Sequence, residues 1–473
     1  MRTSVPKRST GTAPIAVKRD RRPKLAEEVA RRIEKDIIAG GWEEGRFIGS
    51  EADLVKRYGV SRWSIREAIS ILERDGLARM RRGGNGGLFV ATPGADAAVE
   101  ALRNYLEFSR VSVEDIIAAR APIEELVVVL AAKRIDTVAI AQLQRLASEV
   151  TSAPIEDIAP YGITMLKALR EATRNVVLAV FSKTLGQLTM VFTMRSDISD
   201  ERFQKFYYQL MRTRVAQVKA IAGKEIDAAR RIEQEHIRVS RTMLTASIAN
   251  LPKNRRTLAV GRKRVARWLA TDATSPVSLK RSDLVAQQIH MGIVAAGWQP
   301  GAHLGLEPEL QKRYGVSRAV FREAVRSLER LGAVEMRAGG GRGLKVGSPD
   351  PAATIRTAQI FLTHCGAKPE EVNEVSAALD RTAVLLAARR PPPERKAAAE
   401  RLRAIAMSKS DATLSEEANR MGEFYLTLAE ACGNPILELF MRVLQGMARL
   451  KAQQQLPARK IEQVLKQIRS IQV

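Results

Sequence analysis

Cysteine is nearly absent from this chain, which has only Cys365 and Cys432 among its 473 residues. Two such distant cysteines form neither a disulfide framework nor a zinc-ligand motif, and they suit a reducing cytoplasm. Aromatic residues make up only 5% of the chain, so a stacking platform for single-stranded nucleic acid is not expected.

Long apolar stretches are also scarce. We see no uninterrupted apolar run of about 18 residues, so no membrane-spanning helix is expected. The N-terminus lacks the apolar core of a secretory signal, so no such signal is expected either. The sequence contains no evident nucleophile–base set, phosphate-binding glycine loop or metal-ligand cluster. It therefore predicts neither an enzyme nor a bound cofactor.

Positive charge, in contrast, is abundant. The chain has 77 Lys and Arg against 52 Asp and Glu, for a net charge of +25. Such an excess favours polyanionic partners, nucleic acid first and anionic membranes second. The length predicts roughly two to four domains.

One stretch of the sequence occurs twice, as YGVSRWSIREAISILERDG at 58–76 and as YGVSRAVFREAVRSLERLG at 314–332. In an ungapped alignment of 41–77 with 297–333, 20 of 37 positions are identical. A repeat of this length is a folded unit rather than a solenoid element.

The repeated stretch has the pattern of a helix-turn-helix. Apolar residues recur at helical spacing in the first copy, at Ile65, Ala68, Ile69 and Leu72. Ser61 is a candidate N-cap, and a Gly-containing turn separates this helix from a shorter one that begins at Glu51. Downstream, glycine-rich segments at 80–90 and 336–346 predict a β-hairpin wing in each copy.

Arginines lie beside the turn and off the apolar stripe. A solvated charged helix face is the simpler explanation of one arginine pair, but here the pair adjoins a basic wing and the whole set recurs. The sequence therefore predicts binding to double-stranded DNA. The expected contacts are Ser61, Arg62, Trp63, Ser64, Arg66, Arg81, Arg82 and Asn85 in the first copy, and Ser317, Arg318, Arg322, Arg326, Arg337 and Arg342 in the second.

The motif order is Gly-Trp-x-x-Gly, Glu-x-x-Leu, Tyr-Gly-Val-Ser-Arg-x-x-x-Arg-Glu-Ala and a glycine-rich wing. It resembles the winged helix-turn-helix of the GntR family of bacterial transcription regulators, over 24–92 and 280–347. In that family the residues matching Ser61, Arg62, Ser64 and Arg66 approach DNA, and the wing tip lies at the minor groove. Between the two arginines this chain departs from the usual family residues in both copies, which leaves the target sequence open.

Residues 94–250 have a helical pattern throughout and resemble the effector domain of the FadR-like (FCD) branch of that family. The stretches Arg120–Glu124 and Glu171–Asn175 carry this resemblance. In many members an Asp and three His hold a divalent metal, and the ligand is a small carboxylate. Aligned on Asn175, those four positions fall on Gly162, Leu166, the vicinity of Arg214, and His236.

A single histidine cannot hold Zn²⁺, so the resemblance predicts no metal here. The candidate ligand-binding residues are Arg120, Asn175 and His236. Two alternatives stay open: Arg120 forms a structural pair with Glu124, its i, i+4 neighbour, and His236 is an ordinary core or surface histidine.

Residues 350–473 are helical as well, and the stretch 430–434 matches the family more closely than its first-copy counterpart. The family's Asp, first His and Arg positions are occupied here by Met421, Tyr425 and Ser376. This second copy is expected to be a scaffold that packs against its twin.

The predicted fold class is mainly α: two winged helix-turn-helix domains with small β-hairpin wings, each followed by an all-α helical bundle. The expected segments are a disordered basic tail at 1–23, winged domains at 24–93 and 280–347, helical effector-like domains at 94–250 and 348–473, the second one shortened, and a basic linker at 251–279.

The predicted function is that of a sequence-specific DNA-binding transcription regulator, a repressor, in the cytoplasm and associated with the nucleoid. A small organic acid is the expected effector, and no membrane partner is expected. The two halves form a pseudo-dimer within one chain, or the chain forms a homodimer. The alternative is an architectural protein that binds DNA without sequence preference.

Overall fold

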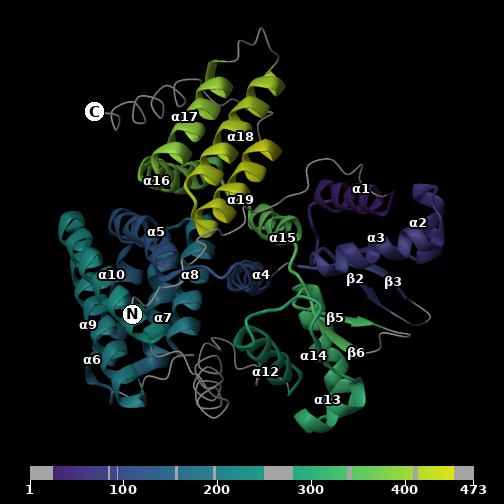
Figure 1. The fold of residues 1–473 in the computed structure, drawn as a ribbon, viewed down its shortest axis with the longest axis horizontal. Helices are drawn as coiled ribbons and strands as arrows, with labels where there is room; N and C mark the ends of the chain where they lie inside the picture. The colour runs from purple at the N-terminus through teal and green to yellow at the C-terminus, as the bar shows by residue number, and fades with distance from the viewer. Residues whose placement is uncertain are drawn as a thin grey trace, which may run out of the picture.

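The computed structural model describes residues 25–249 and 281–451, apart from short breaks at 82, 84–85, 93, 155–157, 195–198, 338–342 and 408–413. The expected basic tail and linker lie outside the described residues, as do the predicted DNA contacts Arg82, Asn85 and Arg342. Two winged units lie on one side of the molecule, and two helical bundles lie on the other (Figure 1).

Unit 1 (residues 25–92) is a winged helix-turn-helix. Its elements are α1 (Leu25–Ala39), β1 (Phe47–Gly49), α2 (Glu51–Tyr58), α3 (Arg62–Arg74), β2 (Ala78–Arg81) and β3 (Gly87–Val90). Ser50 closes a capping box at the start of α2, and Gly59 ends that helix at φ 65°, a backbone conformation that favours glycine. The strands form a sheet in the order β1-β3-β2. The hairpin was predicted, but the third strand, β1, was not.

Unit 2 (residues 281–347) repeats this arrangement. Its elements are α12 (Arg281–Ala295), β4 (His303–Gly305), α13 (Glu307–Tyr314), α14 (Arg318–Arg330), β5 (Val334–Arg337) and β6 (Gly343–Val346). The sheet order is β4-β6-β5. The apolar stripe of α14 is buried, with Phe321 fully inaccessible, as the corresponding stripe of α3 is in unit 1.

Bundle 1 (residues 95–249) consists of seven described helices. They are α4 (Ala95–Phe108), α5 (Val113–Arg134), α6 (Thr137–Ser152), α7 (Ile158–Ala172), α8 (Val176–Met194), α9 (Asp200–Ala222) and α10 (Ile226–Ala249). The expectation about apolar runs needs one correction. By length and composition, Val176–Thr193 of α8 could cross a membrane, with a mean hydropathy of 1.5. This window is 61% buried and packs against α4 and α5, as the core helix of a bundle does.

Bundle 2 (residues 351–451) has five described helices. They are α15 (Pro351–His364), α16 (Pro369–Ala388), α17 (Pro392–Met407), α18 (Leu414–Ala431) and α19 (Pro435–Lys451). In order and position they correspond to α4–α8 of bundle 1. Counterparts of α9 and α10 are not among the described residues of this bundle.

The two bundles share one continuous hydrophobic core, to which α5, α8, α16 and α19 all contribute. Phe181 of α8 and Phe440 of α19 stack with ring centroids 3.9 Å apart and planes 7° from parallel. Each lies six residues after an asparagine that caps its helix, Asn175 or Asn434. Because equivalent residues meet each other, this contact lies on a local two-fold axis.

The two asparagines make reciprocal bonds across that axis. Asn175 Nδ2 donates to the carbonyl of Glu371 at 3.0 Å, and Asn434 Nδ2 donates to the carbonyl of Asp115 at 3.0 Å. Glu371 and Asp115 are themselves equivalent, since each lies three residues after the N-cap of its helix, α16 or α5, and accepts the backbone N–H of that N-cap residue. The bundles therefore meet as two subunits of a symmetric dimer do.

Each winged unit packs on the helix that follows the other winged unit. The ring centroids of Trp42 in unit 1 and His364 in α15 are 4.9 Å apart, and those of Trp298 in unit 2 and Phe108 in α4 are 5.6 Å apart. Arg356 of α15 also reaches into unit 1, where it binds the carboxylates of Asp75 at 2.7 Å and Glu34 at 2.6 Å. The two halves are thus crossed, with each winged unit in contact with a helix of the opposite bundle (Figure 1).

Candidate nucleic-acid interface and effector cavity

The second helix of each helix-turn-helix, α3 or α14 (the recognition helix), is exposed at its N-terminus. Ser61 caps α3 by accepting the Ser64 N–H, as predicted, and Arg62 and Arg66 are exposed. Trp63 is 71% exposed, which is unusual for so large an apolar side chain. Ser64 differs from the prediction, because its side chain is buried and its hydroxyl lies 2.9 Å from that of Ser61. Ser64 therefore belongs to the helix cap and not to the exposed surface expected to contact DNA.

An acidic residue at the start of the preceding helix orients the second arginine in both units. Glu51 accepts from Arg66 Nε at 2.9 Å, and Glu307 accepts from Arg322 Nε at 2.9 Å. Glu307 also forms an ion pair with Arg318, at 3.3 Å. The pKa of Glu307 is lowered, mainly by its hydrogen bond with Arg322. Among the described residues Arg62, the counterpart of Arg318, has no ion pair. Equivalent arginines are thus held differently in the two units.

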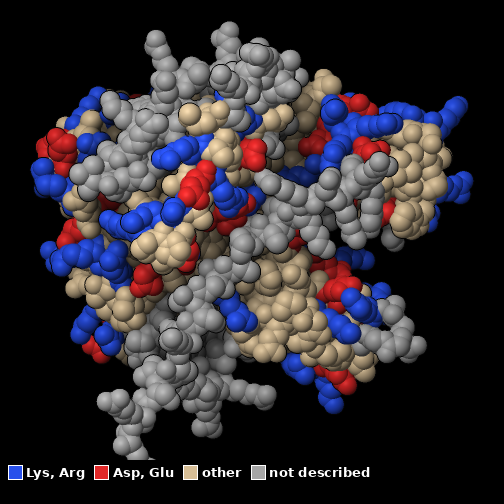
Figure 2. All heavy atoms as spheres, turned by 45° about the horizontal axis from the view of Figure 1, so that its top comes forward, with Lys and Arg blue, Asp and Glu red and all other residues tan. Residues whose placement is uncertain are grey.

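The wings differ as well. Arg81 at the end of β2 lies over the Phe89 ring, with 4.4 Å from its guanidinium carbon to the ring centroid. Arg337 at the end of β5 instead pairs with Glu335 at 3.1 Å. Arg326, another predicted contact, lines a cleft of about 1470 Å³ together with Arg66 and Arg81 of unit 1. Figure 2 shows Lys and Arg side chains at the outer edges of both winged units.

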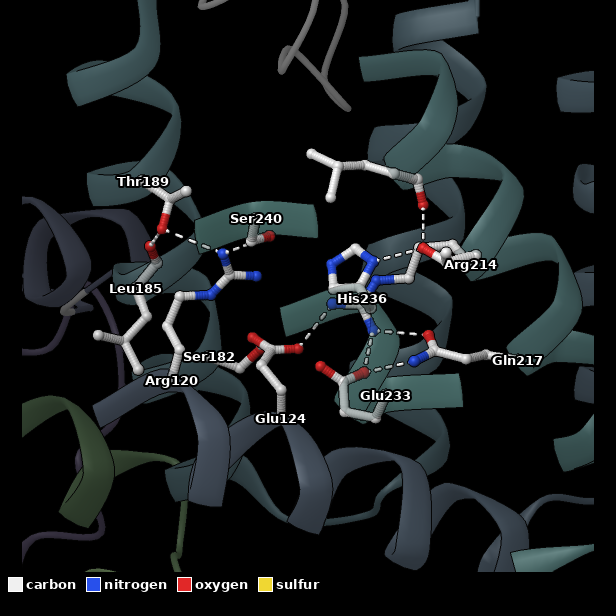
Figure 3. Close-up of polar contacts among 12 residues, drawn as sticks. Arg120, Glu124, Ser182, Leu185, Thr189, Arg214, Gln217, Glu233, His236 and Ser240 are labelled. Carbon is white, nitrogen blue, oxygen red and sulfur yellow. Dashed lines mark hydrogen bonds and ion pairs between the residues drawn. The ribbon is translucent and has the colours of Figure 1, made fainter. Parts of the chain in front are cut away.

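Bundle 1 encloses a buried network of charges centred on Arg214, whose side chain is 2% exposed. Its two terminal nitrogens pair with Glu124 Oε2 and Glu233 Oε2, each at 3.0 Å (Figure 3). Burial alone would lower the pKa of Arg214, but the two carboxylates raise it above the usual value. Burial raises the pKa of Glu233 to about 7. At Glu124 burial also acts to raise the pKa, but the positive charges of Arg214 and Arg120 have the larger combined effect and lower it.

Beside this network lies a cavity of about 80 Å³. Arg120 and His236 both line it, and both are at least 95% buried. Arg120 Nη1 donates to the hydroxyls of Thr189 at 3.3 Å and Ser240 at 3.1 Å. Burial lowers the pKa of His236 well below its ordinary value, and the positive charges of Arg214 and Arg120 add to the effect. Its imidazole is therefore neutral at physiological pH.

Comparison with known proteins identifies the family. Residues 25–90 and 281–343 match the profile described as "Bacterial regulatory proteins, gntR family", and residues 371–471 match that of the FCD domain. The chain belongs to the GntR family. It carries the DNA-binding domain of that family twice and one matched FCD domain, over 371–471, and it is a transcription regulator that binds DNA.

Three curated relatives each align with about half of this GntR-family chain. The putative HTH-type transcriptional regulator RmpR of Mycobacterium gastri is 26% identical, over 45% of this chain and 77% of its own length. The HTH-type transcriptional repressor NanR of Citrobacter rodentium is 27% identical, over 49% of this chain and 87% of its own length. The putative L-lactate dehydrogenase operon regulatory protein of Escherichia coli is 28% identical, over 45% and 84%.

The metal site found in many FCD domains does not fit this chain. Leu166, Arg214 and His236, at three of the four expected ligand positions, line the cavity of bundle 1. A leucine has no donor atom, and a guanidinium has no lone pair and carries a positive charge, so neither can coordinate a metal. The described residues include no group of three or more His, Cys, Asp or Glu side chains that could hold an ion. Arg214 places a cation inside the bundle without a metal.

Of the two interpretations left open for Arg120, the hydrogen-bonded pair with Glu124 is not made, because the oxygens of Glu124 bind Ser182 and Arg214. The expectation for Asn175 was wrong. Asn175 is not in the cavity, since its side chain caps α8 and binds α16 of the other bundle. The sequence placed Arg214 at a metal position but did not suggest that it forms an ion-pair network.

Removing divalent metal is expected to leave the protein unchanged, because the buried cation is part of the chain. Dialysis against EDTA should not shift the thermal unfolding temperature, and elemental analysis should find no stoichiometric divalent ion. About one equivalent of Zn²⁺, Mn²⁺ or Ni²⁺ per chain, or a clear drop in unfolding temperature after EDTA, would contradict this assignment.

Proposed function

We propose that this GntR-family regulator acts as a covalent pseudo-dimer, which places both of its winged units on one DNA site and represses transcription there. The observation that carries this proposal is the crossed packing of the two halves, with Trp42 on α15 and Trp298 on α4. It brings two DNA-binding units into one chain with a shared core, the arrangement that otherwise requires two subunits. Repression is proposed because NanR, one of the relatives, is named a repressor.

The proposed site is not a palindrome. Operator symmetry mirrors protein symmetry, and the two recognition helices here present different side chains. Exposed Trp63 of unit 1 is replaced by Ala319 in unit 2, and Ser70 is replaced by Arg326. The chain would therefore read two unlike half-sites about one helical turn apart.

Substituting Arg62 or Arg318 by alanine is expected to weaken specific binding by about 1–3 kcal/mol each, if each guanidinium reads a guanine edge. Each variant should lose protection mainly at one half-site. Fluorescence anisotropy with the footprinted site would measure affinity, and footprinting would show which half is lost. Arg145→Ala is the matched control, because Arg145 is exposed on α6 and far along the chain from both winged units.

A short palindromic footprint occupied by two chains, each using one winged unit, as shown by the mass of the complex, would reject the pseudo-dimer. Wild-type affinity in both arginine variants would instead reject the assignment of these arginines as DNA contacts. Equal affinity for the site and for unrelated genomic fragments at moderate salt would favour an architectural DNA-binding protein instead.

We also propose that bundle 1 senses a small organic acid. Support comes from its cavity, which Arg120 and Arg214 line, whereas the predicted ligand positions of bundle 2 have neither cation. The expected outcome is that the acid changes affinity for DNA. We place this activity in the cytoplasm, at the nucleoid, and propose no catalytic role.

A further inference from the structure

Each half of the chain contributes a winged unit and a helix to two junctions between the halves. Half 1 (residues 25–249) and half 2 (residues 281–451) meet in junction 1, where unit 1 lies on α15, and in junction 2, where unit 2 lies on α4. At junction 1 the helix carries the base. Arg356 of α15 binds Asp75 through Nε at 2.7 Å and Glu34 through Nη2 at 2.6 Å. Burial alone would lower the pKa of Arg356, but the two carboxylates of unit 1 raise it.

Junction 2 has the opposite arrangement, because there the helix carries the acids. The side chain of Glu107 in α4 is inaccessible to solvent, and its Oε2 lies 3.8 Å from Nε2 of His290 in unit 2. Glu100 lies two turns earlier on the same helix, and burial raises its pKa. In unit 2, Arg330 acts to lower the pKa of Glu100 more strongly than Asp283 acts to raise it. Helix α4 thus presents two carboxylates to unit 2, whereas α15 presents a guanidinium to unit 1.

The charged residues of the two junctions occupy equivalent positions in the repeat. The ungapped alignment of the two winged units extends through the helices that follow them, α4 and α15. The matched pairs are Glu34 with His290, Asp75 with Leu331, Glu100 with Arg356, and Glu107 with Thr363. Each winged unit is therefore complementary in charge to the helix of the opposite half, and not to the helix that follows it in its own half.

Pairing of two like halves would bring equal charges together. If unit 1 of one chain lay on α4 of a second chain, its two acids would face Glu100 and Glu107. If unit 2 lay on an α15, Arg356 would lose both of its carboxylates and would face Leu331 and His290 instead. A contact between like charges that is closed to solvent, or a guanidinium that loses its acceptors there, opposes association strongly. The pairing of half 1 with half 2 satisfies both junctions.

The contact between the bundles favours the same pairing. Arg134 and Asn175 of half 1 both bind Glu374 of half 2, with 3.0 Å between Asn175 Nδ2 and Glu374 Oε2. The residue of half 1 equivalent to Glu374 is Ala118, which has no acceptor in its side chain. Two copies of half 1 would therefore lose both of these bonds.

We propose that these charges select the partner of each half, so that half 1 accepts half 2 and rejects a second copy of half 1. This inference rests on the pseudo-dimer proposed above and names what keeps a second chain out of it. The two halves are also joined covalently, which raises their effective concentration and directs the permitted pairing into a single chain.

Exchanging the charges of the two helices in the full chain tests the selection. The exchanged variant carries Glu100→Arg, Glu107→Thr, Arg356→Glu and Thr363→Glu. Crossed packing then sets like charges against each other, whereas two chains paired half to like half satisfy both junctions. Sedimentation velocity and native mass spectrometry without DNA should give one chain for the wild type and about twice that mass for the variant. An exchanged variant that stays a single chain would overturn the proposal.

A second exchange should reverse the first. Adding Glu34→His, Asp75→Leu, His290→Glu and Leu331→Asp to the exchanged variant exchanges the charges of the winged units as well, so the crossed pairing is complementary again. The mass should return to that of one chain. Arg145→Glu is the control for a reversed surface charge, because Arg145 is exposed on α6, and it should leave the mass unchanged. A twofold mass that persists after the second exchange would overturn the proposal.

Single variants cover a multiple variant that fails to fold. Arg356→Gln removes the ion pairs of junction 1, whereas Arg356→Glu reverses their sign. Hydrogen exchange of α1 should be faster in the glutamate variant than in the glutamine variant by at least about tenfold, because a like-charge contact costs more than a lost pair. Adding Glu34→Arg to Arg356→Glu should restore most of the protection. Equal exchange in the two variants, or no rescue, would overturn the proposal.

Failure of the pseudo-dimer itself gives a different result. A wild-type protein that sediments as two chains would reject the pseudo-dimer, and the comparison of the two Arg356 variants would then decide the charge selection alone. A wild-type single chain whose exchanged variant is also a single chain would reject only the selection.

Discussion

Replacing Arg214 by methionine is expected to destabilise the protein by about 3–5 kcal/mol, the loss typical of a buried ion pair that loses one partner. The methionine fills much of the space but leaves Glu124 and Glu233 buried without their shared cation. Chemical denaturation monitored by circular dichroism would give the free energy of unfolding. Arg238→Met is the matched control, since that arginine is 75% exposed, and it should leave the free energy of unfolding close to the wild-type value.

The loss in Arg214→Met should grow with pH. Without the guanidinium, burial raises the pKa of both carboxyls above their unfolded value, so the folded state favours the protonated acids. That contribution is fully present below the unfolded pKa of about 4.3 and is lost as pH rises through the folded pKa. Adding Glu124→Gln and Glu233→Gln should recover part of the stability and remove the added pH dependence. A variant as stable as wild type at pH 8 would show that the network is not a structural element.

Phe181→Ala is expected to cost about 3–5 kcal/mol, the usual cost of removing a buried phenylalanine. Phe181 and Phe440 are both fully buried and stack on the local two-fold axis, so either substitution opens a cavity between the bundles. Because the two rings contact each other, the double variant should lose less than the sum of the single losses. Denaturant titration of the two single variants and the double variant gives the free energies of unfolding for a double-mutant cycle. Met407→Ala, at a 70% exposed site, is the control.

The same substitution tests whether the two halves unfold together. The core is continuous between the bundles, so both should be destabilised in a single transition. Loss of the shared core should also weaken DNA binding, since each winged unit packs on a helix of the opposite bundle. Two separate transitions, with only bundle 1 affected, would mean that the bundles are independent and that their contact is weak.

Local sequence determined the winged units. Apolar residues at helical spacing, a serine cap and a glycine that tolerates positive φ specify the helix-turn-helix from adjacent residues alone. The cap at Ser61 is found as predicted, and Ser317 caps the equivalent helix of unit 2 in the same way. The repeat showed that this unit occurs twice. The mainly α character of the rest followed from uninterrupted helical periodicity, and the family from motifs within the winged units. Ser64 was misjudged because exposure depends on which face of the helix packs inward.

Tertiary structure decided how distant segments meet. Trp42 packs on His364, and Arg214 bridges Glu124 and Glu233, across chain separations that no local pattern encodes. The i, i+4 spacing left a pair between Arg120 and Glu124 open, but Arg214 from another helix binds that carboxylate at 3.0 Å. Asn175 was expected at a ligand and instead caps a helix and joins the two bundles. Charge pairing in a core depends on which helices pack together, and sequence spacing along one helix does not contain that information.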